Sequence, residues 1–111
     1  MGEINTIPGT AADGGIVTPL GVVTVAHELT TGQNAVLCVR PEHLLGRGPA
    51  LGEVTIRDGA FFGTHTRVHL QAEGLPTLVA HLPIGAETSP GTTLAVTPDP
   101  DALFILPGES Q

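Results

Sequence analysis

The chain has 111 residues and carries 4 basic against 11 acidic side chains, a formal net charge of −7 with neutral histidines. All basic residues are arginines, and lysine, tryptophan and tyrosine are absent. This composition argues against a nucleic-acid-binding domain, which needs phosphate-neutralising charge and stacking rings. The length fits one ordinary domain. The lone Cys38 has no partner for an internal disulfide, which fits a reducing compartment.

We expect no signal peptide and no direct membrane insertion. No apolar run approaches the roughly 18 residues that span a bilayer. No basic segment followed by an apolar stretch is present either.

Short apolar runs, rich in β-branched and aliphatic residues, follow one another along the chain. Glycine (15) and proline (10) separate many of these runs, and a spacing of this kind is typical of an antiparallel β-sandwich or barrel. No window has a long 3.6-residue period. A single helical turn is expected at residues 42–45, directly after Pro41. The predicted strands are residues 16–18, 22–26, 35–39, 53–62, 66–72, 77–82, 94–97 and 103–106.

Two halves are expected, residues 1–47 and 51–107, joined by the glycine-rich segment 46–49. Neither half carries enough apolar residues for an independent core. We therefore predict one composite all-β domain over residues 1–111.

Histidine is the most suggestive residue for chemistry. If the chain folds back at Gly74, alternation puts His65, Arg67 and His69 on one face, with His81 opposite Arg67 on the next strand. Three neighbouring imidazoles are a possible metal site. The alternative is a solvated polar face, favoured because Arg67 adds a cation and this strand face carries no carboxylate.

No catalytic machinery is expected in this chain. Neither Ser89 nor Ser110 lies in a nucleophile elbow, and Cys38 lies in an apolar run where a small buried side chain fits best. Without lysine, the chain has no Gly-x-x-x-x-Gly-Lys phosphate loop. The residues by themselves predict a small β module that acts in binding, assembly or regulation.

Several segments, in order, resemble one family. Residues 39–44, which contain Arg40, Pro41 and Glu42, resemble the Arg-Pro-Glu signature of the TOBE domain, a C-terminal extension of the ATP-binding subunits of bacterial ABC importers. Residues 52–54 and 61–66, with Phe61, Phe62 and Gly63, look like its Gly-x-Val … Phe-Leu-Gly stretch. Further segments that resemble the family are residues 2–9, 18–21, 90–91 and 99–100.

The resemblance implies an OB-fold-like β-barrel, with strands from both ends of the chain completing a small second β-subdomain. It implies a noncatalytic regulatory and dimerisation domain of an importer for polyamines (spermidine or putrescine), ferric iron or sugars. The domain would form a homodimer, join an upstream nucleotide-binding domain and work with membrane permease subunits. No cofactor is expected here; ATP and magnesium would bind elsewhere in the parent.

The same resemblance implies a cytoplasmic location, peripheral to the bacterial inner membrane through the transporter complex. Met1 directly precedes a segment that resembles the part following the catalytic domain, so we expect an imposed start.

The signature also has a physical interpretation. Pro41 biases Arg40 toward extended geometry, and the guanidinium then has Glu42 or another carboxylate within reach. A structural ion pair at the strand exit is the simpler account, and a contact with another domain or subunit is the alternative. Because Phe61 and Phe62 are adjacent, at most one of them belongs to the main core on simple alternation. We expect a dimer contact at this pair or at the 103–106 edge.

A small-ligand binding module is the alternative function, for an oxyanion, as in molybdate-binding proteins, or for the transported solute. The residues nearest to the related oxyanion motif, at 31–34, lack its arginine.

Overall fold

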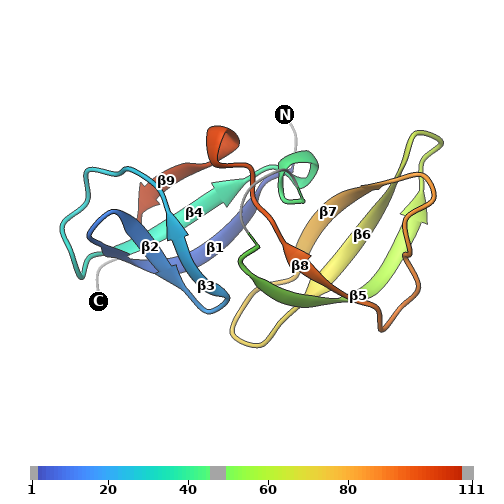
Figure 1. Cartoon of the computed structure of the whole chain (residues 1–111), viewed down its shortest axis with the longest axis horizontal. Coiled ribbons are helices and arrows are strands. Elements are labelled where there is room, and N and C mark those ends of the chain that lie inside the picture. Colours follow the sequence, from blue (N-terminus) through green and yellow to red (C-terminus); the bar gives the residue numbers. More distant parts are fainter. Residues whose placement is uncertain (1–2, 46–49, 109–111) are drawn as a thin grey trace.

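The computed structural model describes residues 3–45 and 50–108, which form two antiparallel β-sheets placed end to end (Figure 1). The described chain measures 42 × 25 × 25 Å along its principal axes. The predicted connecting segment 46–49 lies outside the described residues. The expected all-β, OB-like class with little helix is confirmed, and both sheets are curled.

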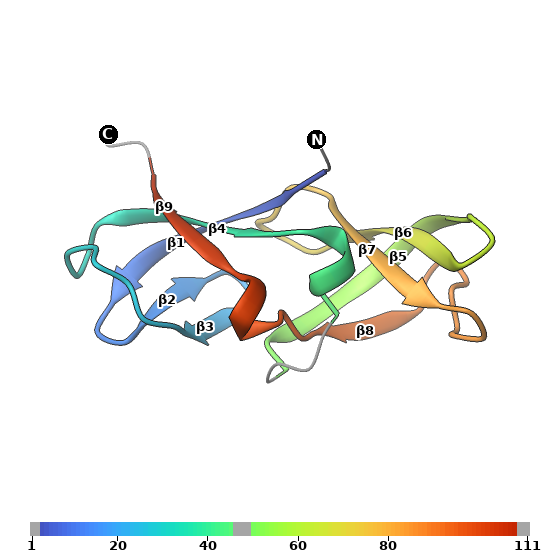
Figure 2. The ribbon, with the colours of Figure 1, turned by 90° about the horizontal axis from the view of Figure 1, so that it is seen from above.

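The first sheet has the strand order β3-β2-β1-β4-β9 and the second has the order β7-β6-β5-β8. The last strand therefore returns to the first sheet, where it pairs with β4 on the side opposite β1 (Figure 2). Strands from both ends of the chain thus complete one sheet, as the resemblance implies. The elements are β1 (Asn5–Ala12), β2 (Gly15–Thr18), β3 (Gly21–Thr24), β4 (Asn34–Val39), the 3-10 turn η1 (Pro41–His43), β5 (Gly52–Phe61), β6 (His65–Gln71), β7 (Leu78–Pro83), β8 (Thr93–Val96), the 3-10 turn η2 (Pro100–Ala102) and β9 (Phe104–Pro107).

All eight predicted strands and the turn after Pro41 are present, but β1 was missed because Pro8 interrupts it. The peptide of Ala11 donates to the carbonyl of Gln33 at 2.8 Å. By alternation, the nitrogen of Pro8 points away from β4. Pairing with β2 begins only at Thr10, so no ladder bond is lost at the proline.

Gly9 also made this segment look like a loop, yet the sheet requires glycine there. A Cβ at Gly9 would lie 2.6 Å from both Cγ2 of Ile16 and the carbonyl oxygen of Val17. The glycine therefore permits a close approach of β1 and β2 that any side chain would block.

One hydrophobic core runs through both sheets. It joins Ile7 and Leu37 of the first sheet to Leu70 and Val96 of the second, all completely buried. Leu44, which follows η1, is also completely buried and belongs to the same cluster. The two sheets therefore behave as one packed unit.

Asn5 connects the sheets through its side chain. It is 5% exposed, and its Nδ2 donates to the carbonyl of Val79 at 2.7 Å, while the Val79 peptide donates to its Oδ1 at 2.8 Å. Since β7 is an edge strand, this carboxamide occupies the position of a neighbouring peptide group. β1 is thereby bonded to both sheets.

Replacing Asn5 by alanine should lower the free energy of unfolding by about 1–3 kcal/mol, because both polar groups of Val79 lose their partner. Urea unfolding of the Asn5→Ala variant measures this loss. Thr6→Ala, at the exposed neighbouring position, is the control and should change stability by less than about 0.5 kcal/mol. Equal effects of the two substitutions would contradict a connecting role for Asn5.

Candidate functional site

The outer face of the second sheet carries the three predicted histidines. The register pairs Arg67 with His81 and His69 with Val79, as expected. The opposite face is apolar and buried, which confirms the predicted alternation. The His65 and His81 rings stack at 4.1 Å with an interplanar angle of 28°. Phe62 adds a third ring, 5.9 Å from that of His65.

His69 does not join this stack. It belongs to a chain of hydrogen bonds between charged and polar side chains, with a carboxylate at each end, which we call the charged relay. Its Nδ1 lies 2.5 Å from Oδ1 of Asp58, and Arg67 Nη1 lies 3.3 Å from its Nε2. Because arginine only donates, Nε2 accepts, and Nδ1 donates to the carboxylate. Arg67 also donates from Nε to Oε1 of Glu3 at 2.9 Å and from Nη2 to Oε2. The relay therefore runs from Asp58 through His69 and Arg67 to Glu3.

Neither carboxylate belongs to the histidine strand, so sequence alternation did not reveal them. The β5–β6 register shifts between Ile56 and Asp58, and this irregularity sets Asp58 opposite His69. Glu3 reaches Arg67 from the segment that precedes β1. Both contacts arise from tertiary placement.

The relay sets the ionisation of its members. The Arg67 hydrogen bond lowers the pKa of Glu3, and the His69 hydrogen bond lowers the pKa of Asp58. The Glu3 contact raises the pKa of Arg67. Burial lowers the pKa of His81, and the nearby charge of His65 lowers it further.

A metal site at the three histidines has no support in this geometry. Among residues 3–45 and 50–108, no group of three or more His, Cys, Asp or Glu side chains is placed to hold a metal ion. His65 and His81 present ring faces to one another, whereas His69 bonds to Asp58 and Arg67.

The signature residues Arg40, Pro41 and Glu42 form the exit from β4. Arg40 is extended, with φ −73° and ψ 153°, and its carbonyl accepts from the peptide of His43 at 2.9 Å. Pro41 is buried at the start of η1, and Glu42 is exposed. Within the described part of the chain, the exposed Arg40 guanidinium has no hydrogen bond or ion pair. The expected ion pair with Glu42 is not formed.

Phe61 and Phe62 lie beside the β5–β6 turn, with relative exposures of 65% and 58%. Neither joins the core. The following Gly63 has φ +85°, a left-handed conformation that favours glycine. These three residues thus form an exposed apolar turn.

Four exposed apolar side chains lie on the outer face of the first sheet, two at each edge, with Thr10 and Asn34 on the strands between them. Val17 pairs with Val22. The strand registers across β1 and β4 put Phe104 and Leu106 on the same face of the sheet as these two valines. Each of these four side chains is 45–61% exposed. We call these four residues the outer face.

The free edge of β9 is a poor site for pairing with another strand. The Gly108 peptide donates to the carbonyl of Asn34 at 2.8 Å, so alternation turns the peptide groups of Ile105 and Pro107 toward the edge. Proline has no N–H, and it removes one donor from this edge.

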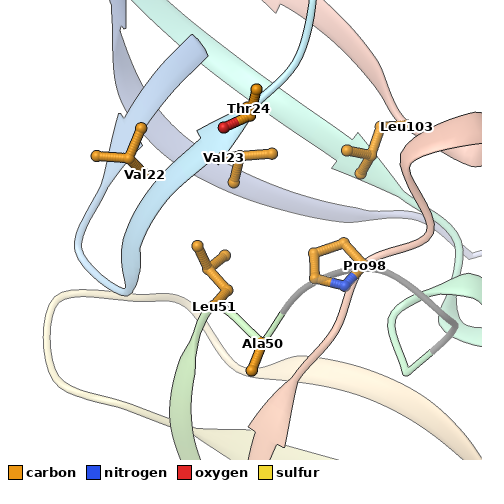
Figure 3. A pocket seen from close by; sticks show the side chains of 7 residues that line it. All are labelled: Val22, Val23, Thr24, Ala50, Leu51, Pro98 and Leu103. Carbon is orange, nitrogen blue, oxygen red and sulfur yellow. The ribbon is translucent and has the colours of Figure 1, made fainter.

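A cavity of about 120 Å³ lies where the two sheets meet (Figure 3). β3, the segment at 50–51 and the connection from β8 to β9 contribute its walls. Its lining residues are Val22, Val23, Thr24, Ala50, Leu51, Pro98 and Leu103.

Cys38 is 2% exposed on β4, and burial raises the pKa of its thiol. This agrees with a small buried side chain rather than a nucleophile. None of the described helices is long and apolar enough to span a membrane.

Comparison with known proteins supplies a family match. The model of the TOBE domain family matches residues 37–106, more than half of the chain. The Fe(3+) ions import ATP-binding protein FbpC of Streptomyces coelicolor is 35% identical over 104 residues, which are 93% of this chain. The chain spans 28% of the length of that relative.

Acidification should destabilise the domain in two stages. Because its pKa is lowered on folding, His81 opposes protonation in the folded state, so stability should fall as pH drops below about 6.5. The stabilisation from Glu3 and Asp58, whose pKa values are also lowered, is present above about pH 4.5 and is lost as they become protonated. Melting temperature against pH measures both stages.

Substitutions separate these stages. His81→Gln should flatten the loss between pH 7 and 5, and Asp58→Asn should flatten the loss below pH 4.5. Glu73→Gln, on an exposed turn, is the control and should leave the profile unchanged. An unchanged profile in His81→Gln would contradict the assignment of the first stage.

Arg40→Ala should change the free energy of unfolding by less than about 0.5 kcal/mol, since the side chain has no described ion pair to lose. Chemical unfolding of the isolated chain measures this difference. A loss above about 1 kcal/mol would instead restore the structural role considered from the sequence.

Proposed function

Since the chain belongs to the TOBE domain family, we propose that it is the noncatalytic regulatory and dimerisation domain of the ATP-binding subunit of an ABC importer. The family match over residues 37–106 carries this proposal. The similarity to an ATP-binding import protein over most of the chain supports the parent assignment.

The remainder of the proposed parent supplies what this chain lacks. ATP and magnesium would bind in an upstream nucleotide-binding domain, because a chain without lysine has no Gly-Lys phosphate loop. Permease subunits would be the membrane partners, and the subunit would lie at the cytoplasmic surface through them. Of the three solute classes considered from the sequence, ferric iron is favoured, because the similar Streptomyces coelicolor protein is an Fe(3+) import protein.

The outer face is the best candidate for the homodimer contact. Its four apolar side chains are each about half exposed or more on a paired sheet, and burying them against a second copy would remove that surface from water. Pro107 weakens the alternative of edge pairing, and Phe61 with Phe62 forms a separate candidate at the far turn.

Substituting Leu106 by glutamate should weaken self-association at least tenfold, about 1.4 kcal/mol, because the interface would then bury a charge. Sedimentation equilibrium over a range of concentrations measures the dissociation constant. Phe62→Ser is the matched control, since Phe62 is similarly exposed but lies outside the outer face.

Circular dichroism shows whether each variant is still folded, so that a loss of dimerisation is distinguished from a loss of folding. Weakening by Phe62→Ser but not by Leu106→Glu would move the contact to the β5–β6 turn. Monomers at every concentration, both for this chain and for the full-length subunit, would contradict the dimerisation role.

A further inference from the structure

The cavity between the sheets has the properties of a ligand site of its own. Three segments far apart in the chain line it: β3 with Val22, the segment at 50–51, and the β8–β9 connection with Pro98 and Leu103 (Figure 3). A molecule bound here would contact both sheets at once.

The lining selects for a neutral ligand. Six of the seven lining side chains are apolar, and the seventh is the hydroxyl of the exposed Thr24. No charged side chain among the described residues lines the cavity, so an ion there would lose its water without a compensating partner from these residues. This chemistry fits neither an oxyanion nor a metal cation.

The size is appropriate for a compact molecule. An engineered apolar cavity of roughly 150 Å³ in another protein stays dry and binds benzene or xenon. The volume here, about 120 Å³, is close to that value, and the exposed Ala50 in its lining indicates access from solvent. A single ring with at most one small polar group therefore matches the space.

The walls resist collapse into the space. A Cβ on Gly52 would lie 2.6 Å from the carbonyl oxygen of Leu20, and one on Gly21 would lie 3.1 Å from that of Leu51. The β2–β3 turn and the start of β5 are therefore already in main-chain contact. The Leu51 peptide also donates to the carbonyl of Val96 at 2.7 Å, which fixes this wall to the second sheet.

We propose that this cavity binds a compact, neutral, predominantly apolar ligand, with its apolar part among Val23, Leu51 and Leu103 and its polar end near Thr24. Such a ligand bridges the two sheets and stabilises their relative placement. Its role as a regulatory effector rests on the proposed function, whereas binding itself does not depend on that assignment.

Three probes with one ring size but different charge test the proposal: benzyl alcohol, benzoate and benzylammonium. Methyl-labelled protein is titrated with each, and the Val and Leu methyl chemical shifts are followed by NMR. Benzyl alcohol should shift the methyls of Val22, Val23, Leu51 and Leu103 to saturation. Both ions should bind at least tenfold more weakly.

A cavity-filling variant supplies the structural control. Ala50 is exposed and lies outside the strands, so Ala50→Leu adds three carbons to the cavity without altering the core. It should weaken benzyl alcohol binding at least tenfold. Ala86→Leu makes the same change on a turn of the second sheet and should leave binding unchanged. Leu103→Phe, on the β8–β9 side of the cavity and outside the outer face, should repeat the Ala50→Leu effect if that variant folds poorly.

Non-saturating shifts, equal affinity for all three probes, or unchanged binding to both filling variants would overturn the proposal. Probe affinity should also be independent of protein concentration. If probe affinity falls as the chain self-associates, a side chain of a second copy occupies the cavity instead of a small ligand. Sedimentation without probe tests dimerisation separately, so the two hypotheses fail independently.

Discussion

The arrangement of this domain depends on the two hydrogen bonds between the Asn5 carboxamide and the main chain of Val79. Asn5 pairs with Val39 through its backbone, in the first sheet, and with β7 through its side chain. A buried carboxamide must satisfy both its donor and its acceptor, and an edge strand offers one of each. These two hydrogen bonds fix which residue of β7 lies beside Asn5, which apolar packing alone does not determine.

The connection also determines what lies around it. Glu3, two residues before Asn5, is brought to Arg67 on the outer face of the second sheet. Arg67 then donates from its third nitrogen, Nη1, to His69, which in turn bonds to Asp58. The Glu3–Arg67 half of the relay is thus a consequence of where β1 begins, and Glu3 pairs with the positive charge of Arg67.

A domain built from two short sheets has a functional consequence. The sheets share one core. At Gly21 and Gly52 their main chains are already in contact, so they cannot move closer to fill the cavity beside them. Val17, Val22, Phe104 and Leu106 remain exposed on the outer face of the first sheet. A regulatory domain needs surfaces that respond to partners and ligands, and this architecture provides one candidate for each.

Patterns along the chain were enough to predict the all-β class, eight of the nine described strands, the turn after Pro41 and the pairing of Arg67 with His81. These follow from local alternation and turn chemistry, which a single chain displays directly. Tertiary structure decided the rest. Pro8 and Gly9 concealed β1, because a proline is tolerated only where the neighbouring strand has ended and a glycine is required only where one approaches closely. Asp58 reached His69 through a register shift, and Glu3 arrived from a distant segment. The cavity, and the lack of an ion pair between Arg40 and the described residues, likewise depend on distances between segments, which no residue pattern along the chain specifies.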